Sequence, residues 1–595
     1  MQKTFLILLL ALNYFVGFSQ NSEVLADSYY KRGEFKKALV IYQNLESQNP
    51  NTNKYINKIV DTHQQLEQFE EAQNILLERL SKYRSPSFLI ELGYNYQLKD
   101  SLDRATELYE EAIAVIDRNP SFIYGIARTF ENHSLLDQAI RVYNKGKSLT
   151  PDRDYSLQLA RIYGDQGNVE QMFASYIDYI AYRPNYLNNI KRAISDFISE
   201  NSINKNNIFL RKLLLKNIQQ QPEVYWYEML SWLYVQERAY NKSFIQEKAL
   251  YKRNPESLDR IIELAITALN DKDSNTAQVI FTYILEITQD VSIALTAHQY
   301  LLEIKTENAT KKELDEIDMA YNDLFKSFGK SELTIPLQLA YGQFLAFYLN
   351  DTEKASSFLR ESLKLKISEF QEAKVKLLLA DILVLQEKFN EALIFYSQIQ
   401  MQLKNSTISQ EARFKVAKTS YYKGDFDWAE SQLKILKSST SQLIANDALD
   451  LKLLISDNKY EDSTQTALKY YAKADLLSFQ NKTDQAINLL DKILTEHKGE
   501  TITDQALFQQ AKLFEKKQLY NKAEFNYLEI IKDYNEDILA DDAHYYLAEL
   551  YNTHLDRPEE AKQLYEKIIF EFQDSIYFID ARKKFRVLRG DNINQ

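Results

Sequence analysis

Apolar and polar positions alternate along this chain with the period of an α-helix, and the pattern comes in pairs of short helices. Between residues 26 and 50, small and aromatic residues stand three and four positions apart, so they share one face of a helix. Gly33 separates two such helices, and Pro50 follows the second because proline does not continue a helix. We therefore expect a helix–turn–helix unit in which Ala26 lies on the first helix and Ala38 and Tyr42 on the second.

The unit recurs along the chain, and the position of Ala38 marks each copy. The next markers follow at intervals of 34, 33, 34 and 33 residues: Ala72, Ala105, Ala139 and Met172. After a degenerate stretch at 186–221, two more markers are Ser243 and Ala277. Residues 290–333 form an atypical pair, and the later markers are mostly about 37 residues apart: Ala355, Ala392, Ala429, Ala486, Ala523 and Ala561. One longer interval leaves room for an extra helix near 441–457.

The offsets within the unit at 26–50 are those of the tetratricopeptide repeat (TPR), so the chain resembles the TPR family. Each such repeat packs on its neighbours and not around one central core. The predicted fold class is therefore all-α, an α-solenoid or superhelix of stacked helix–turn–helix repeats. Few Gly (12) and Pro (9) residues in 595 agree with nearly continuous helix.

This pattern divides the chain into four parts. The predicted parts are a signal peptide at 1–19, an N-terminal TPR array at 20–333, a C-terminal array of longer units at 334–570, and a capping helix and tail at 571–595.

The first residues predict export. Lys3 precedes a largely apolar run of about a dozen residues, too short to span a bilayer, and small residues precede Gln20, the expected first mature residue. The chain has no cysteine, so we expect neither disulfides nor a lipoprotein anchor. Removal of Lys3 changes the net charge from −12 to −13, which argues against nucleic acid as a partner.

Residues 504–588 resemble envelope TPR proteins of bacteria in particular. An Asp-x-Ala start of the first helix and an aromatic–Ser–x–x–x–x–Ala junction are similar to the BamD-type assembly lipoprotein and the periplasmic coordinator of the Tol–Pal system. The resemblance covers about two units and implies the periplasm or cell envelope of a Gram-negative-type bacterium. The chain departs from the lipoprotein because it lacks the acylated cysteine.

Residues that carry chemistry are scattered. The six histidines show no His-Glu-x-x-His spacing, and no phosphate-binding glycine loop or nucleophile elbow occurs. We predict no metal, no cofactor and no enzyme activity, and we expect His544 and His554 to lie at the surface. Asp541 and Asp542 are interpreted as the N-terminal cap of a helix.

The candidate binding residues lie on the first helices, which line the concave groove in the TPR family. The resemblance places these outward positions one residue after the small residue of each unit: Asp27, Asp61, Tyr94, Arg128 and Arg161. Family members that bind a C-terminal carboxylate use a Lys/Asn pair four residues apart, where this chain has Glu23 and Asp27. A carboxylate clamp is therefore disfavoured.

An aromatic stripe is the densest candidate site. Tyr225, Glu228 and Trp232 share one helix face, whereas Tyr227 and Tyr234 fall at core positions. Exposed aromatic residues often anchor partners, so the stripe is predicted to face the groove. The competing interpretation, that it packs against the preceding helix pair, is favoured, since aromatic stripes at helical spacing are usually core.

The sequence thus favours an exported, non-catalytic scaffold that binds a protein or extended peptide in its groove. Two alternatives stay open: a periplasmic carrier or assembly factor for outer-membrane proteins, and an envelope hydrolase with an unrecognised site.

Overall fold

The structure, a computed structural model, describes residues 22–50, 52–307, 309–436, 441–460 and 464–591. Over these ranges the chain is all-α and contains no strand, which confirms the predicted fold class. No helix in the described ranges is both long and apolar enough for a bilayer crossing. The predicted signal peptide at 1–19 lies outside the described residues.

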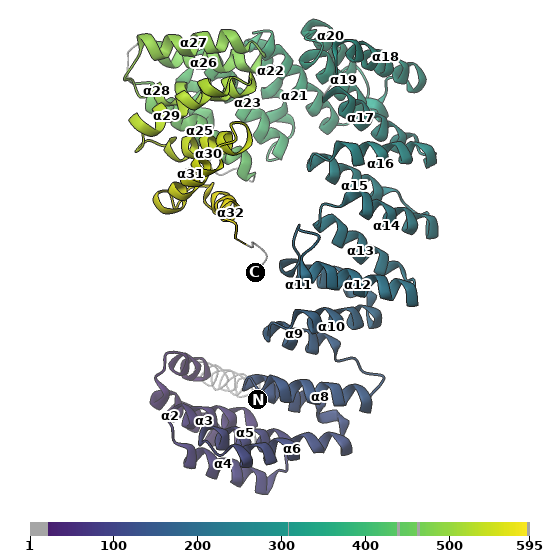
Figure 1. Ribbon diagram of the computed structural model, residues 1–595, viewed down its shortest axis with the longest axis vertical. Coiled ribbons are helices and arrows are strands. Elements are labelled where there is room, and N and C mark those ends of the chain that lie inside the picture. Colours follow the sequence, from purple (N-terminus) through teal and green to yellow (C-terminus); the bar gives the residue numbers. More distant parts are fainter. Residues whose placement is uncertain (1–21, 51, 308, 437–440, 461–463, 592–595) are drawn as a thin grey trace, which may run out of the picture. The chain divides into compact units, whose positions relative to one another are not determined.

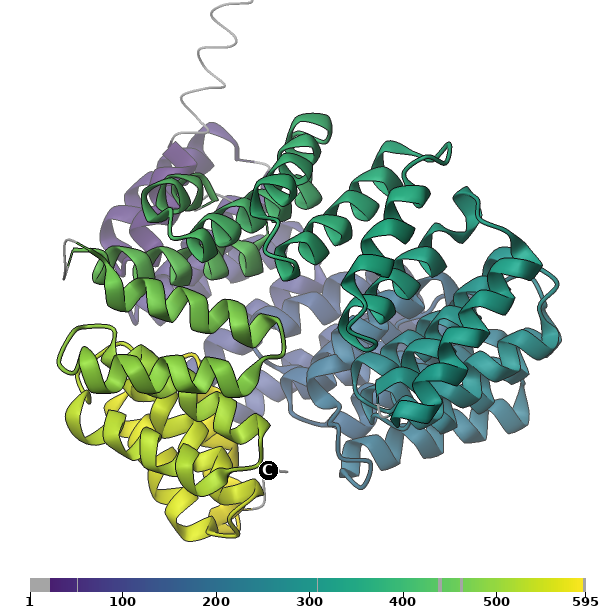
Figure 2. The ribbon, with the colours of Figure 1, turned by 90° about the horizontal axis from the view of Figure 1, so that it is seen from above.

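Two compact units make up the chain, Met1–Glu256 (unit 1) and Ser257–Gln595 (unit 2). Within each unit, helices that follow one another in sequence pack side by side as antiparallel pairs (Figures 1 and 2). The predicted change in repeat length falls at a different place, after Leu333, inside unit 2.

Unit 1 begins with a helix over residues 22–31. The elements that follow it are α2 (Phe35–Gln48), α3 (Asn53–Gln65), α4 (Phe69–Lys82), α5 (Pro86–Leu98), α6 (Leu102–Arg118), η1 (Pro120–Phe122), α7 (Ile123–Asn132), α8 (Leu136–Leu149), α9 (Ser156–Asp165), α10 (Val169–Tyr182), η2 (Pro184–Tyr186), α11 (Leu187–Ile194), η3 (Ser195–Phe197), α12 (Lys205–Gln220), α13 (Val224–Gln236) and α14 (Tyr240–Arg253).

Unit 2 continues the antiparallel pairs. Its elements are α15 (Asp259–Asn270), α16 (Ser274–Ile287), α17 (Val291–Glu307), α18 (Lys311–Phe328), η4 (Glu332–Thr334), α19 (Ile335–Phe347), α20 (Thr352–Ser362), α21 (Glu369–Leu385), α22 (Phe389–Gln402), α23 (Thr407–Lys423), α24 (Phe426–Leu436), α25 (Gln442–Asn458), α26 (Thr466–Phe479), α27 (Thr483–Glu496), α28 (Thr503–Lys516), α29 (Tyr520–Asp533), α30 (Ala540–Thr553), α31 (Pro558–Glu571) and α32 (Phe578–Arg589).

The turn between the two helices of each repeat has one residue with left-handed backbone conformation, five positions before the marker. Glycine, which adopts positive φ without strain, fills this place at Gly33, Gly167 and Gly424. Elsewhere non-glycine residues adopt it: Glu67, Asp100, Ser134, Arg238, Lys272, Asn350, Glu387, Asn481, Gln518 and Asp556. Since every marker is also at most 2% exposed, the repeat register read from the sequence is confirmed.

Small residues let the two helices of a repeat approach closely. A Cβ atom added to Gly93 would lie 2.6 Å from Cε1 of Tyr109, so the α5–α6 contact requires glycine at this position. In the first unit, Ala26, Ala38 and Tyr42 are fully buried, as the sequence predicts.

Two of the three irregular stretches keep the paired architecture, since α17 packs on α18 and α24 on α25, whereas α12 packs on α10 and α13. The degenerate residues 186–221 contain α11 and α12, the atypical pair is α17 and α18, and the extra helix is α25. Helix α26 then packs against α23, past the α24–α25 pair, and Gln480 Nε2 donates to the carbonyl of Leu385 at 3.0 Å. The last helix, α32, packs on α31.

Three expectations about single residues were wrong. His544 is buried, and its Nδ1 lies 2.7 Å from the carbonyl of Ala540, whereas His554 is exposed as expected. The N-cap of α30 is Leu539; Asp541 and Asp542 lie in the first turn and make no cap hydrogen bond. Tyr227, expected in the core, is only partly buried.

Candidate protein-interaction surface

The candidate surface in unit 1 is the first-helix face, defined by the predicted residues Asp27, Asp61, Tyr94, Arg128 and Arg161. Its first member, Asp27, bridges three helices. The hydroxyl of Tyr42 on α2 donates to Asp27 Oδ1 at 2.5 Å, and Lys58 Nζ on α3 lies 3.2 Å from the same oxygen. Burial raises the pKa of Asp27, but the hydrogen bonds and the charge of Lys58 outweigh burial and lower it overall.

The same three-helix bridge occurs twice in unit 2. Asp381 on α21 accepts from Tyr396 at 2.6 Å and pairs with Lys415 of the next first helix at 3.0 Å. Glu549 on α30 accepts from Tyr565 and pairs with Lys584 on α32 at 2.6 Å. We call such a residue a bridged carboxylate. Its tyrosine comes from the second helix of its own repeat, and its lysine comes from the next helix of the stack.

Glu23, at the other clamp position, is also engaged within the chain. It pairs with Lys54 and accepts a hydrogen bond from the hydroxyl of Tyr55 at 3.2 Å. Both positions that a carboxylate clamp would need therefore hold acids already paired with lysines.

Asp61 occupies the position of Asp27 in the next repeat, but neither bridging partner is present. Leu76 occupies, relative to the marker of its repeat, the position that Tyr42 occupies in the first repeat. Glu91 occupies, relative to the small residue of its own helix, the position that Lys58 occupies on α3. Asp61 is partly buried and accepts no hydrogen bond from any described residue. Burial, together with the charge of Glu91, raises its pKa to about 6.

Tyr94 joins this group through His133, which directly follows α7. Nε2 of His133 lies 2.9 Å from Glu91 Oε2, and the rings of His133 and Tyr94 stack with centroids 4.0 Å apart. Burial lowers the pKa of His133, but the hydrogen bond and negative charge of Glu91 outweigh burial and raise it. The structure thus brings Asp61 and Tyr94 together, with Glu91 and His133, which the sequence did not single out.

The remaining predicted residues lie apart from this group. Arg128 and Arg161 are exposed on α7 and α9. On α13, Tyr225 and Trp232 are partly buried against the core cluster that contains Trp226 and Leu210. Glu228 is also partly buried, and the role of the stripe as an anchor for a partner stays a prediction.

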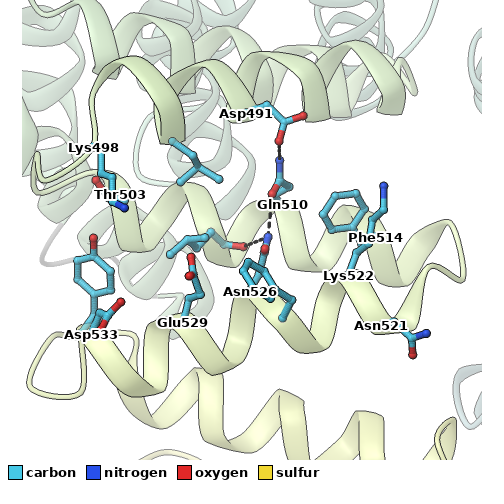
Figure 3. A pocket seen from close by; sticks show the side chains of 14 residues that line it. Asp491, Lys498, Thr503, Gln510, Phe514, Asn521, Lys522, Asn526, Glu529 and Asp533 are labelled. Carbon is cyan, nitrogen blue, oxygen red and sulfur yellow. Dashed lines mark hydrogen bonds between the residues drawn. The ribbon is translucent and has the colours of Figure 1, made fainter.

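Unit 2 contains a pocket of about 490 Å³ that was not predicted from the sequence (Figure 3). It lies over α28, between the second helices α27 and α29. At its floor, Gln510 Nε2 donates to Asp491 Oδ1 at 2.7 Å, and Asn526 Nδ2 donates to Gln510 Oε1 at 2.8 Å (Figure 3). Gln510 and Asn526 are 2% and 4% exposed. The sequence signal for this pocket is Gln510, a glutamine at a core position where other repeats carry Leu230 or Leu379.

Phe514 and Leu507 add apolar surface to this pocket, and Phe525 and Lys522 lie at its edge on α29. The described residues contain no group of three or more His, Cys, Asp or Glu side chains placed to hold a metal ion.

Comparison with known proteins agrees with the repeat geometry. Residues 25–52 and 542–575 match the family model described as tetratricopeptide repeat. No curated protein sequence matches the chain. The chain therefore contains TPRs, and its stacked helix pairs form an α-solenoid, a fold that suggests protein partners.

Solved structures that align with nearly the whole length of this chain do so with low TM-scores. A structure of Naa15/Naa10 bound to HypK-THB has 12% identity and a TM-score of 0.30 over 97% of this chain and 95% of that chain. The APC/C hetero-tetramer Cut9–Hcn1 has 13% identity and a TM-score of 0.25, with 96% of each chain covered. Yeast Tom70 has 12% identity and a TM-score of 0.27 over 96% of this chain and 99% of that chain. At these scores the structures carry no argument about function.

Proposed function

We propose that the protein is an exported, non-catalytic TPR scaffold of the bacterial cell envelope that binds a protein or extended peptide on its first-helix face. The observation that carries this proposal is Asp61 with Glu91, Tyr94 and His133, a partly buried polar group on the face that TPR proteins use for recognition. A partner that covered it would bury aromatic rings and pair charges that are now close together without a full set of counter-ions.

The location rests on the sequence. The apolar segment after Lys3 has the length of a signal peptide, and residues 504–588 resemble envelope TPR proteins. Amino-terminal sequencing of the protein purified from its own bacterium should find Gln20 first, in the periplasmic fraction. A protein that starts at Met1 and remains in the cytoplasmic fraction would contradict export.

Crosslinking and affinity purification from envelope fractions would test the scaffold role. One partner in a fixed ratio, lost with Tyr94→Ala, supports a scaffold. Many unfolded outer-membrane proteins would instead support the carrier alternative. Hydrolysis of cell-wall or peptide substrates by the pure chain would support the enzyme alternative and count against both.

A further inference from the structure

The bridged carboxylates show what this fold places next to an acid on the first helix of a repeat. At Asp27, Asp381 and Glu549 a lysine ammonium from the next helix lies 3.2, 3.0 and 2.6 Å from the carboxylate. The chain therefore supplies its own cation at each of these sites. A charge-assisted contact of this kind is stronger than a neutral hydrogen bond.

Beside Asp61, the position that carries the lysine at the bridged carboxylates has the opposite charge. Glu91 replaces the lysine, and its charge adds to burial in raising the pKa of Asp61. Glu91 is 6% exposed and its Oε2 is paired with His133, whereas its Oε1 accepts no hydrogen bond from any described residue. Asp61 also accepts no hydrogen bond from any described residue, so this pair of acids lacks the lysine that the chain supplies at each bridged carboxylate.

The surroundings of this pair suit a cation with an aliphatic stem. Tyr94 covers His133 on one side. Burial raises the pKa of Tyr30 on the first helix, and the charge of nearby Asp61 raises it further. Lys58, the nearest lysine, is paired with Asp27. Tyrosine rings attract ammonium and guanidinium groups and pack against methylene chains.

We propose that Asp61 and Glu91 bind a lysine or arginine side chain of the partner polypeptide, in the place that Lys58 takes beside Asp27. This inference rests on the proposed function and adds the chemistry of the ligand to it. Asp61 pairs directly with the cation, Glu91 Oε1 accepts its second hydrogen bond, and Tyr30 and Tyr94 flank its stem.

Binding of this cation is linked to pH through the groups that face it. These are Tyr30 on the first helix, Lys58 and Asp61 on α3, Glu91 and Tyr94 on α5, Tyr109 on α6 and His133 after α7. As the pH falls from 7.5 to 5, Asp61 takes up a proton and His133 becomes more fully charged. Both changes remove net negative charge, so the affinity for a cation falls.

The test uses the purified chain and 12-residue peptides selected on it from a random display library at pH 7.5, measured by fluorescence anisotropy. We expect a lysine or arginine in the peptide whose replacement by norleucine weakens binding about tenfold or more. Asp61→Asn and Glu91→Gln should each cause a similar loss. In Asp61→Asn the norleucine replacement should add little, and the affinity should depend less on pH between 5 and 7.5, because only the charge of His133 still changes.

Asp103→Asn is the control, since it makes the same charge change on α6 at an exposed site. It should change affinity less than about twofold. The norleucine peptides leave the protein unaltered, so they give an answer even if a protein variant folds poorly.

Two results would overturn the inference in different ways. Peptides that lose affinity with Tyr94→Ala, but bind Asp61→Asn and Glu91→Gln at full strength, would contradict the cation site and leave the proposed function standing. If no selected peptide is affected by Tyr94→Ala, or none binds at all, the first-helix face is not the binding surface and both proposals are wrong.

Discussion

The hydroxyl of Tyr42 donates a hydrogen bond of 2.5 Å to Asp27 Oδ1, and this contact ties the second helix of the first repeat to an acid on its first helix. Lys58 completes the bridge from the next repeat. This polar bridge adds to the apolar contacts that join neighbouring repeats in a solenoid. It holds a charged side chain on the surface that partners would meet, without leaving its charge unpaired.

Tyr42→Phe should therefore lower the free energy of unfolding by about 1–3 kcal/mol, because it removes the donor and keeps the buried ring. Tyr83→Phe is the matched control: Tyr83 is 51% exposed and its hydroxyl makes no hydrogen bond with described residues, so we expect a change within about 0.5 kcal/mol. Denaturant unfolding at pH 7 measures both. Equal effects would show that the Asp27 contact contributes nothing specific.

The difference in the free energy of unfolding between wild type and Tyr42→Phe should depend on pH with a definite sign. The folded-state pKa of Asp27 is lowered, so Asp27 contributes stability above its unfolded pKa of about 3.9, and this contribution is lost as the pH falls through the folded value. Without the hydroxyl of Tyr42, the pKa of Asp27 is lowered less. The gap between wild type and Tyr42→Phe should thus narrow below about pH 4, and a gap that widens on acidification would contradict this account.

Gly93 and Gly125 offer a second pair of variants. An alanine Cβ at Gly93 would overlap the ring of Tyr109, whereas one at Gly125 meets nothing within 4 Å. We expect Gly93→Ala to destabilise the protein by about 1–3 kcal/mol and Gly125→Ala to stabilise it by about 0.5–1 kcal/mol. Thermal unfolding of both proteins checks the sign. A loss in both would mean that the α5–α6 contact is not what requires glycine.

The repeat register was predictable because the residues that define it lie close together in sequence. A small residue at Ala38, an aromatic at Tyr42 and the turn between the helices lie within one unit, so their spacing is visible in sequence. The turn itself is hidden at positions such as Glu67 and Arg238, which adopt positive φ without being glycine. There the packing of the two helices decides the backbone conformation, and residue type does not reveal it.

The group around Asp61 could be predicted only in part. Asp61 and Tyr94 follow small residues of the register, so their positions were available from the sequence. His133 lies 42 residues from Glu91, beyond the end of α7, and only the stacking of α5 on α7 brings the two together. The pocket at Gln510 was missed for a similar reason, since Asp491 and Asn526 belong to two different repeats.

Helix α13 carries one tryptophan in the core and one at its edge. Trp226 is 1% exposed, so Trp226→Ala should cost about 3–5 kcal/mol. Trp232 is only partly buried against the same cluster, and Trp232→Ala should cost clearly less. Melting temperatures compare the two, and partner binding by Trp232→Ala then tests the anchor prediction. A loss of stability as large as that of Trp226→Ala would place Trp232 in the core.

The amide network in the unit 2 pocket allows a prediction about coupling. Gln510→Leu removes one acceptor of Asn526 Nδ2, which keeps its contact with the carbonyl of Leu507, so one buried N–H loses a partner and the loss should be about 1–3 kcal/mol. Adding Asn526→Leu removes that buried donor as well, and two apolar side chains can then pack together. The double variant should therefore be more stable than the sum of the single losses predicts, by about 0.5–3 kcal/mol in a double-mutant cycle. Strict additivity would mean that Gln510 and Asn526 act independently, and that the pocket floor gains nothing from their hydrogen bond.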